Sequence, residues 1–462
     1  MARILLIDAT AVPKDSPFLS QPVGLISMAA VLRQHGHTVR VHDCKLDVSS
    51  LPGLLALYDP QVVGIRSLSV FTNVLSWVAQ IVQHTLPGVR IVVGGPHATL
   101  NSEDALRRCG PGSIAVLGEG EVTFLELVDA LVGGAALADL DSVAGLAMYV
   151  DGQLVRTAPR PMIKDLDSLP FPAYDLLPME EYFTLHHGGT SASGRTMTTL
   201  TSRGCPFGCA FCHNIFGRHF RAQSAELVVE QLAYLTRRYN LEEVELHDDA
   251  FNTRRERVLD ICHGLQRLGS PVALAFPNGL RGDQLDREQL LELRLAGTHH
   301  MALSPETASP RLQEILGKKM DLDRLGRAAE ICHELGIFTV GYFMLGFPTE
   351  TEEEIEATID WACASAFHTA SFFVVNPFPG TRLHELARQS GKLPVDMPTA
   401  SYFTAGRNFS DVPDSRFRQL WHSAYRRFYL SPRRVKMVLS SVPNRGTLVR
   451  NSLFVGARLL GS

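Results

Sequence analysis

Three cysteines near the middle of the chain have a spacing that suits metal binding. Cys205, Cys209 and Cys212 form a C-x3-C-x2-C pattern in a loop that also contains Gly204 and Gly208. Thiolates bind soft metals and iron–sulfur clusters. A four-iron cluster held by three cysteines keeps one iron without a protein ligand, so a chelating small molecule could bind there. The pattern therefore favours an iron–sulfur cluster.

Two other interpretations of these cysteines stay open: a zinc site, or buried thiols that bind no metal. His213 could supply a fourth zinc ligand, but its place next to Cys212 is poorly suited to sharing one tetrahedral ion. The remaining cysteines are scattered and expected to be mostly buried free thiols: Cys44, Cys109, Cys262, Cys332 and Cys363. A reducing cytoplasm suits both these thiols and an oxygen-sensitive cluster, so we expect a cytoplasmic protein.

Length and composition indicate an ordinary globular protein. The 462 residues suffice for roughly two to four domains, and 45% of them are hydrophobic. The formal net charge of −4 gives no large basic field for nucleic acid or an anionic membrane. No apolar run approaches the roughly 18 residues of a membrane span, so we expect no integral membrane segment. The first residues, MARILLIDAT, predict a β-strand and lack the layout of a signal peptide.

Residues 1–150 alternate short apolar strands with amphipathic helices, one of them at 23–32. We expect strands at Arg3–Asp8, Thr38–Asp43, Val62–Ile65, Arg90–Gly95 and Ser113–Leu117. This alternation predicts a doubly wound, Rossmann-like parallel sheet covered on both faces.

Ligands bind such sheets at the carboxyl ends of the strands. Two glycine-containing segments fall there. One contains Gly94, Gly95, Pro96 and His97, and the other begins with Gly118 and Glu119. Because glycine lets a backbone approach a bulky ligand, these residues are candidate ligand contacts; tight turns are the alternative.

Residues 151–195 change in character. The stretch 165–175 is interrupted by proline and aspartate, which favours an extended linker over a helix. The composition of residues 186–194 predicts a flexible segment that could order over a bound ligand.

A second strand–helix repetition begins at Met197 and predicts a partial (β/α)6 barrel over residues 196–390. Expected strands are Thr198–Ser202, Glu243–His247, Val272–Pro277, His300–Ser304, Phe338–Leu345 and Ser371–Asn376. Expected helices are Ala225–Tyr239, Arg254–Leu268, Arg287–Leu295, Asp321–Leu335 and Thr351–Ala366. The cysteine loop follows the first strand.

Polar residues or glycine–proline signatures also follow the later strands. They are Asp248 and Asp249, Arg281, Glu306 and Ser309, Met344 and Gly346, and Pro377. A helix cap is an equally good interpretation of Asp249 or Ser309 taken alone. Together, these residues predict one site distributed around the mouth of the barrel.

The C-x3-C-x2-C loop, with the aromatic Phe211 before its last cysteine, resembles the signature of the radical S-adenosylmethionine (SAM) family. The resemblance implies that Cys205, Cys209 and Cys212 hold a [4Fe–4S] cluster whose open iron chelates SAM. It implies that Asp248 and Asp249 hold the amino group of SAM, in place of the common Gly-Gly-Glu. The remaining implied contacts are Glu306 and Ser309 to the ribose, and Met344, Gly346 and Pro377 to the adenine.

Residues 1–150 resemble the cobalamin-binding domain that precedes the barrel in some of these enzymes. The resemblance rests on residues 22–39, on the segment from Gly94 to Thr99 and on residues 118–121. The D-x-H-x-x-G string, whose histidine ligates cobalt in many cobalamin proteins, is absent. Bound cobalamin should therefore lack that ligand, and His97 more plausibly shapes its loop than ligates cobalt.

The resemblance implies an enzyme that splits SAM into methionine and a 5′-deoxyadenosyl radical. The expected activity is methylation of an unactivated carbon, occasionally phosphorus, of a secondary metabolite or lipid, with methylcobalamin as donor. Cyclisation or rearrangement without methyl transfer is the alternative, and a non-catalytic cobalamin or redox sensor is a third. A small-molecule substrate and an electron donor such as flavodoxin or ferredoxin are the expected partners. Tyr342, His247 and Arg281 are acid–base candidates by position alone.

Residues 391–462 predict a helical region with an amphipathic helix at Phe417–Leu430. Basic residues gather here: Arg416, Arg418, Arg426, Arg427, Arg433, Arg434 and Lys436. A solvated helix face that caps the barrel is the favoured interpretation. The other is contact with an anionic substrate, cofactor or membrane surface.

Overall fold

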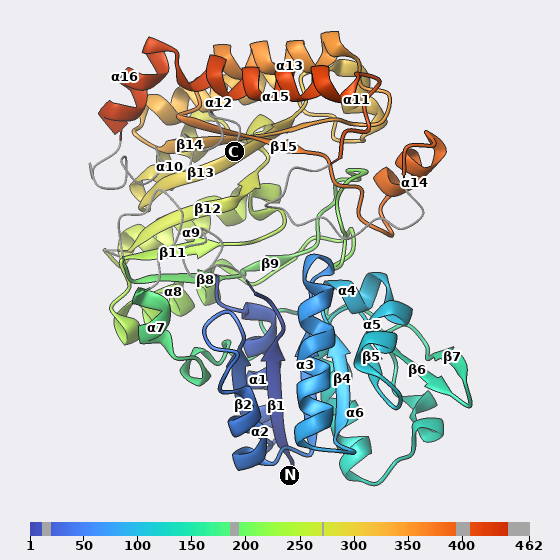
Figure 1. Cartoon of the computed structure of the whole chain (residues 1–462). Helices are drawn as coiled ribbons and strands as arrows, with labels where there is room; N and C mark the ends of the chain where they lie inside the picture. The colour runs from blue at the N-terminus through green and yellow to red at the C-terminus, as the bar shows by residue number, and fades with distance from the viewer. Residues whose placement is uncertain (12–19, 185–193, 270–271, 394–406, 442–462) are drawn as a thin grey trace. The chain divides into compact units, whose positions relative to one another are not determined.

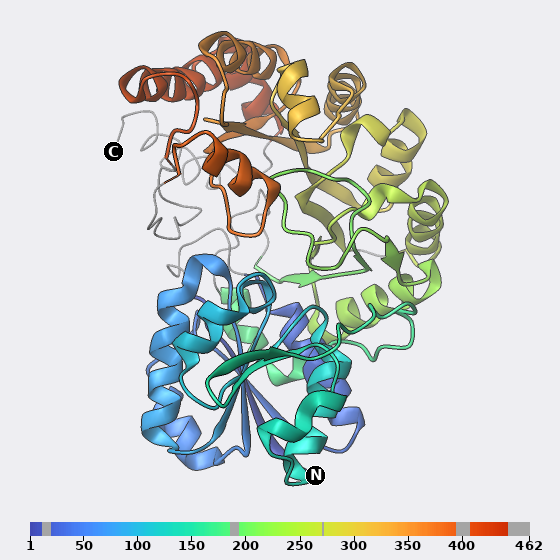
Figure 2. The same ribbon diagram turned by 90° about the vertical axis from the view of Figure 1, so that its right-hand side faces the viewer.

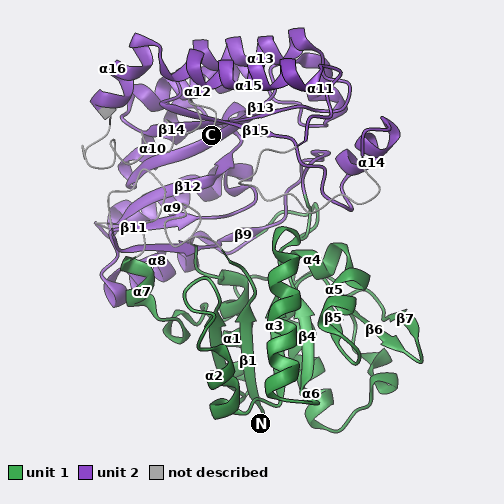
Figure 3. Ribbon diagram, viewed as in Figure 1, with its two compact units in different colours: residues 1–188, 213–221 green, residues 189–212, 222–462 purple. Residues whose placement is uncertain are grey.

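The computed structural model describes residues 1–11, 20–184, 194–269, 272–393 and 407–441 (Figure 1). The chain forms two compact units (Figure 3). Unit 1 consists of Met1–Gly188 and His213–Arg221, and unit 2 of Gly189–Cys212 and Ala222–Ser462. The segment 186–194, expected to order over a ligand, lies almost wholly outside the described residues.

Unit 1 contains a seven-stranded sheet with the strand order β2-β1-β3-β4-β5-β6-β7. The strands are β1 (Arg3–Asp8), β2 (Thr38–Asp43), β3 (Val62–Arg66), β4 (Arg90–Gly94), β5 (Ile114–Val116), β6 (Leu146–Val150) and β7 (Gln153–Arg156). The first five pair in parallel, as predicted. The last two pair antiparallel, which the sequence analysis did not predict.

Helices cover both faces of this sheet (Figure 2). The helices of unit 1 are α1 (Val23–Gln34), α2 (Leu51–Tyr58), α3 (Thr72–Thr85), α4 (Pro96–Leu100), α5 (Ser102–Cys109), α6 (Gly120–Val132) and α7 (Met179–Thr184). Alternate residues of β1 enter two separate cores because strand side chains alternate between faces. Leu5 and Ile7 pack with α2, α3 and α5 residues, whereas Ile4 and Leu6 pack with α1 and α6 residues. The prediction of a doubly wound sheet is confirmed.

The expected linker at 151–195 contains regular structure that belongs to unit 1. Strand β7 lies in the sheet, and a 3-10 turn, η3 (Tyr174–Leu176), precedes α7. Ala173 donates its N–H to the Ile26 carbonyl at 3.0 Å. The compact unit therefore extends well past residue 150, because residues 151–184 pack on the preceding domain.

Unit 2 contains a six-stranded parallel sheet with the order β15-β14-β13-β12-β11-β8. These strands are β8 (Thr196–Thr199), β11 (Glu243–Leu246), β12 (Ala273–Leu280), β13 (Thr298–Glu306), β14 (Phe338–Leu345) and β15 (Thr369–Val374). The helices between them are α8 (Ala225–Tyr239), α9 (Arg255–Arg267), α10 (Arg287–Leu295), α11 (Pro310–Ile315), α12 (Leu322–Glu334) and α13 (Glu352–Ala364). Two short strands, β9 (Ser202–Arg203) and β10 (Arg221–Ala222), complete the set. The predicted partial barrel of six strands is confirmed.

Three helices follow the barrel: α14 (Arg382–Gln389), α15 (Asp414–Tyr429) and α16 (Pro432–Ser441). The aromatic face of α15 packs on the last strand of the sheet. Trp421 Nε1 donates to the Phe372 carbonyl at 2.8 Å, and the Tyr429 hydroxyl donates to the Ala370 carbonyl at 2.7 Å. The helix thereby covers β15, which would otherwise be an open sheet edge.

Candidate active site

The cysteine loop is fastened at its centre, between two parts of unit 2 that come much later in the sequence. Ala210 donates its N–H to the Leu316 carbonyl at 2.7 Å and accepts from the Leu383 N–H at 2.8 Å. Its methyl group is buried in a small core that includes Leu312 and Phe347. The middle of the loop is therefore held while the cysteines on either side extend from it.

A close backbone contact holds the same loop from α11. Gly317 has a φ of +64°, and a Cβ at this position would lie 2.9 Å from the Gly208 carbonyl oxygen. Only glycine tolerates both that conformation and that distance. Gly204, at the start of the loop, donates its N–H to Asp249 Oδ2 at 3.2 Å.

The three thiols lie near enough to influence one another electrostatically. Burial raises the pKa of Cys205, and the neighbouring Cys209 and Asp249 raise it further. Cys212 is exposed, whereas Cys205 and Cys209 are half-buried. Desolvation, together with the Cys209 thiol and Asp249, raises the pKa of Cys212 to about 12. A bound cation is what would keep three such thiols ionised.

The donor set suits a polynuclear cluster. Among the described residues, no three His, Cys, Asp or Glu side chains converge as ligands of one metal ion. A cluster is held through separate irons, so its ligands need not point at one centre. Three thiols on one fixed loop fit that requirement.

A buried cation lies beside the cysteine loop. Lys318 Nζ is 3.1 Å from Glu306 Oε1, and both side chains are about nine-tenths buried. The same ammonium lies 5.9 Å above the Phe211 ring and lowers the pKa of the Cys209 thiol against the effect of burial. Glu306, at the end of β13, has a φ of +65°, which is uncommon for a residue other than glycine. Glu306 was predicted from the sequence, whereas Lys318 was not.

The two adjacent aspartates after β11 have different environments. Asp248 is buried, and its carboxylate accepts bonds of 2.6 Å from the Thr201 N–H, the Thr201 hydroxyl and the Ser202 hydroxyl. Asp249 is exposed. Asp248 therefore fixes the turn after β8, whereas Asp249 is accessible at the cysteine loop.

Ser309 and Arg281 both carry structural bonds. Ser309 caps α11 by accepting the Leu312 N–H at 3.1 Å, and it donates to Glu354 Oε1 at 2.5 Å. The helix-cap interpretation of Ser309 is thus correct. Arg281 pairs with Asp283 at 2.8 Å and lies 4.1 Å above the Phe207 ring, so it supports the cysteine loop from β12.

The glycine–proline turn after β14 is organised by a buried carboxyl group. Glu350 Oε2 accepts the N–H groups of Gly346 at 2.6 Å and Phe347 at 3.0 Å. Burial raises the pKa of Glu350 to about 8. Gly346 has a φ of +93° at this turn, Met344 is half-buried before it, and Pro377 is buried after β15. Glu350 was missed, although its place four residues after Gly346 was visible in the sequence.

The acid–base candidates are held by internal bonds. The Tyr342 hydroxyl donates to the Pro277 carbonyl at 3.1 Å, and burial raises its pKa to about 12. His247 Nε2 lies 3.1 Å from Glu245 Oε2. Position at a strand end therefore does not by itself make either side chain a proton carrier.

In unit 1, the two glycine segments lie at the carboxyl ends of β4 and β5 and are bonded to each other. Gly118 donates its N–H to Thr99 Oγ1 at 3.0 Å. Gly95 and Gly118 have φ values of +89° and +73°. No atom lies within 4 Å of where a Cβ on Gly118 would stand. A Cβ on Gly95 would lie 3.1 Å from the Arg66 Cγ and from the Ser67 carbonyl oxygen, so Gly118 is the open position where a cofactor could approach the backbone.

His97 and Glu119 are both engaged within unit 1. The two ring nitrogens of His97 lie 3.4 Å from Ser69 Oγ and 3.0 Å from Asp104 Oδ2. This is an arrangement that shapes the loop and leaves neither nitrogen for a metal. Glu119 forms a buried pair with Arg221 at 2.8 Å and accepts the Ile163 N–H at 2.7 Å.

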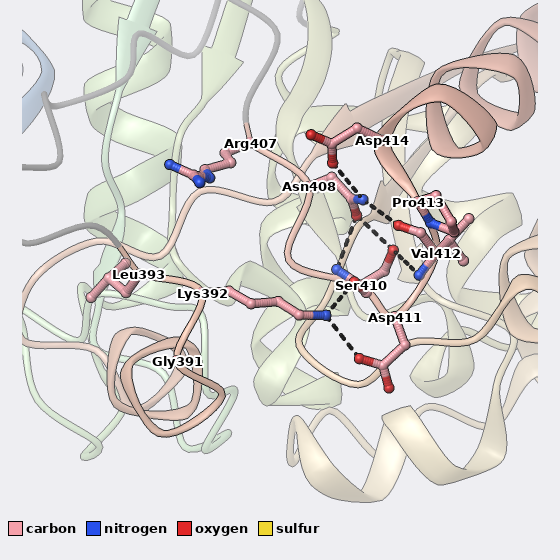
Figure 4. Close-up of a pocket in the computed structure, with 10 residues that line it drawn as sticks. All are labelled: Gly391, Lys392, Leu393, Arg407, Asn408, Ser410, Asp411, Val412, Pro413 and Asp414. Carbon is pink, nitrogen blue, oxygen red and sulfur yellow. Dashed lines mark hydrogen bonds and ion pairs between the residues drawn. The ribbon is translucent and has the colours of Figure 1, made fainter.

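A separate pocket of about 520 Å³ lies in unit 2 (Figure 4). It is lined by Gly391, Lys392, Leu393, Arg407, Asn408, Ser410, Asp411, Val412, Pro413 and Asp414. Asn408 organises it by donating to the Val412 carbonyl at 2.7 Å and accepting from the Ser410 hydroxyl at 2.6 Å. None of the predicted site residues lines this pocket.

Comparison with known proteins agrees with the two units. The family model "B12 binding domain" matches residues 11–128, and the model "Radical SAM superfamily" matches residues 199–362. An uncharacterized methyltransferase of Pyrococcus horikoshii is 33% identical over 420 residues, covering 89% of this chain and 88% of that protein. The chain therefore belongs to the cobalamin-dependent radical SAM methyltransferase family, as the resemblance implied.

Two further relatives show the chemical range of the family. The cytidylyl-2-hydroxyethylphosphonate methyltransferase of Streptomyces wedmorensis is 28% identical over 450 residues, covering 84% of this chain and 82% of that protein. The anaerobic magnesium-protoporphyrin IX monomethyl ester cyclase of Rubrivivax gelatinosus is 28% identical over 329 residues, covering 71% of this chain and 58% of that protein. Methyltransferases and cyclases thus both occur among the relatives.

Solved structures share the fold at low identity. The methyltransferase TsrM from Kitasatospora setae, with cobalamin and a [4Fe-4S] cluster bound, matches with a TM-score of 0.70 and 19% identity over 84% of this chain and 75% of that one. OxsB, with aqua-cobalamin and SAM bound, has a TM-score of 0.77 and 16% identity over 100% of this chain and 75% of that one. In the described part of the chain, no helix is both long and apolar enough to cross a membrane.

Proposed function

We propose that this enzyme methylates an unactivated carbon, or occasionally a phosphorus, of a small secondary metabolite or lipid. The observation that supports this most is the fixed loop with three neighbouring thiols, in a chain that also carries a B12-binding domain. The relatives act on chemically unrelated small molecules, including hopanoids and a bacteriochlorophyllide according to their names. The proposed substrate is therefore defined by its class alone.

Cys205, Cys209 and Cys212 would hold a [4Fe–4S] cluster, and Asp249 would hold the amino group of SAM. When bound, the cluster supplies an electron that splits SAM, and cobalamin carries the methyl group that is transferred. Asp248 would act indirectly, since its carboxylate already holds the turn after β8. Glu306 would contact the ribose from a position fixed by Lys318, and Ser309 would orient that region as a helix cap.

Met344, Gly346 and Pro377 would form the adenine site, with Glu350 holding the turn in shape. In unit 1, Gly94, Gly95, Pro96 and Gly118 would accept cobalamin, while His97 and Glu119 keep their loops in place. A radical reacts with whatever lies nearest, so the main tasks of these residues are positioning and exclusion of water.

The reaction needs one electron at a time, which a flavodoxin or ferredoxin would supply. A cytoplasmic location would keep an oxygen-sensitive cluster reduced.

Anaerobic reconstitution with iron, sulfide, cobalamin, SAM and a strong reductant tests the assignment of the cysteines. Cys209→Ala should abolish 5′-deoxyadenosine formation while cobalamin binding stays close to that of the unaltered protein. Cys363→Ala, which removes a half-buried thiol outside the loop, is the matched control and should keep full activity. SAM cleavage by the Cys209 variant would show that the cluster assignment is wrong.

Cyclisation without methyl transfer is the second candidate, favoured by the cyclase relatives. Methylation yields S-adenosylhomocysteine beside 5′-deoxyadenosine, whereas cyclisation yields only the latter. Metabolites of a deletion strain and its parent should differ by one methylene under the first proposal.

A further inference from the structure

The charge of the chain is distributed very unevenly. The whole sequence has 48 acidic and 44 basic residues, yet residues 415–462 contain ten Lys or Arg and no Asp or Glu. The net charge of −4 conceals this basic end. A strong asymmetry of this kind indicates an anionic partner.

Part of this positive charge is used within the fold. Arg416 pairs with Glu352 at 2.6 Å, and Arg427 pairs with Glu356 at 2.7 Å. Arg434 is buried, lies 4.0 Å above the Phe428 ring and donates to the Ser365 carbonyl at 3.1 Å. These three arginines fasten α15 and α16 to α13 and the segment that follows it.

The other described cations of these two helices are exposed. Arg418, Arg426, Arg433 and Lys436 have no acidic partner among the residues that the structure describes, and Arg433 Nη1 donates to the Ala364 carbonyl at 3.4 Å. Lys436 lies on the exposed side of α16, whereas Arg433 lies one turn before the buried Met437, at the edge of that side.

Large aliphatic side chains lie on that same exposed side. Leu439 is 62% and Val435 46% exposed, one helical turn apart, and Leu430 at the end of α15 is 66% exposed. Figure 1 shows α16 in red, directly after α15. An exposed helix that combines aliphatic and basic side chains is typical of binding in the plane of a membrane interface.

We infer that α16 and the end of α15 form a docking surface for an anionic lipid bilayer. Leu430, Val435 and Leu439 enter the boundary between headgroups and acyl chains, and Arg433 and Lys436 contact the anionic headgroups. The inference does not depend on the proposed reaction, since vesicle binding can be measured without turnover.

Two other partners fit this surface less well. Nucleic acids are bound through polar, basic and aromatic side chains, and the exposed large side chains here are aliphatic. A second copy of the chain would bring like charges together, and a few aliphatic side chains bury far less than the roughly 1,200 Å² of a stable interface.

Flotation of the full-length protein with vesicles tests the inference. We expect binding to vesicles of equal parts phosphatidylcholine and phosphatidylglycerol, loss of binding at high salt, and no binding to pure phosphatidylcholine. Arg433→Ser with Lys436→Ser should reduce partitioning about 30-fold, since each cation near such a surface is worth roughly a factor of five. Val435→Ser with Leu439→Ser should reduce it about tenfold or more.

Matched control variants alter similar residues elsewhere on unit 2. Leu268→Ser with Leu295→Ser removes two leucines that are 53% and 58% exposed, and Arg237→Ser with Arg238→Ser removes two exposed arginines of α8. Both should bind vesicles like the unaltered protein. Absence of vesicle binding, no preference for phosphatidylglycerol, or equal loss in the controls would overturn the inference. So would duplex DNA binding or dimerisation that the α16 variants abolish while vesicle binding persists.

Discussion

The two units place their candidate ligand-binding residues at the same end of a parallel sheet but equip that end differently. In unit 1, the charged side chains at the strand ends bind one another: Asp8 contacts Lys45 at 2.5 Å and Arg66 at 2.7 Å, and Lys45 contacts Asp43 at 3.0 Å. In unit 2, the cysteine loop carries three thiols, and the Lys318–Glu306 ion pair lies beside that loop. Unit 1 therefore offers a surface of glycine backbone against which a cofactor could lie. Unit 2 instead offers thiols and charged side chains that could bond to a ligand.

Of these features, the buried ion pairs of unit 1 should lose the most stability when one residue is mutated. Asp8→Ala leaves Lys45 and Arg66 without their shared carboxylate, so unit 1 should lose about 3–5 kcal/mol of unfolding free energy. Hydrogen exchange of β1, β2 and β3, followed by mass spectrometry, measures this loss separately from unit 2. Asp175→Ala, which removes the exposed partner of Arg33, should cost less than about 1 kcal/mol. Equal losses in both variants would mean that the buried ion pairs do not stabilise this sheet edge.

The ion pairs of Asp8 also predict that unit 1 loses stability at low pH. Burial opposes ionisation of Asp8, but Lys45 and Arg66 outweigh it and lower its pKa from 3.8 to about 2. Because the folded-state pKa lies below the unfolded value, the stabilisation is present above pH 3.8 and is lost as the pH falls towards 2.

In unit 2, Glu350 predicts the opposite pH dependence. Its pKa is raised from 4.5 to about 8, so the folded state retains a proton that the unfolded chain has lost. Stability of unit 2 should therefore fall by about 1.4 kcal/mol per pH unit between these two values. Glu350→Gln, which keeps an acceptor for Gly346 and Phe347, should remove most of that slope in urea titrations at several pH values. An unchanged slope would assign it to other groups.

How much of the fold and of the candidate site could be predicted depends on how far apart in the sequence the interacting residues are. The strands, their order of appearance and the cysteine loop follow from local patterns. The β6–β7 hairpin was also predictable, because Asp151 and Gly152 form an Asp-Gly turn with φ values of +49° and +78°. That signal was missed because the segment was interpreted as the start of a linker.

The side-chain partners of the predicted residues were not predictable from local patterns. Glu119 and Arg221 are 102 residues apart, and the loop residue Ala210 is held by Leu316 and Leu383. Asp248 was predicted together with Asp249 from their place after a strand, yet its bonds go to Thr201 and Ser202, 47 and 46 residues earlier. Local spacing identifies which residues could do chemistry, and tertiary contacts decide which of them are free to do it.

A glycine pair tests whether the edge of unit 1 binds by shape. Gly118 and Gly134 both have positive φ values and open space where a Cβ would stand. Alanine at either position should cost about 1 kcal/mol of stability. Only Gly118→Ala should also weaken cobalamin binding, by about tenfold, because a methyl group there enters the proposed cofactor contact. Equal affinities of the two variants in absorbance titrations would remove Gly118 from the cobalamin site.

Lys318 offers the corresponding test in unit 2. There the question is whether a nearby positive charge promotes ionisation of the loop thiols. Lys318→Met removes the cation that lowers the pKa of all three loop thiols, so their thiolate fraction should fall. Alkylation of Cys209 by iodoacetamide in the cluster-free protein should slow about fivefold if loss of the charge costs the thiolate about 1 kcal/mol. Lys318→Arg keeps the charge and should restore most of the rate, while Cys363, half-buried and outside the loop, serves as the internal reference. If Lys318→Met slowed Cys209 no more than Lys318→Arg does, Lys318 would be a partner of Glu306 alone. The two sheet edges would then resemble each other, because in each unit the charged side chains would pair only with one another.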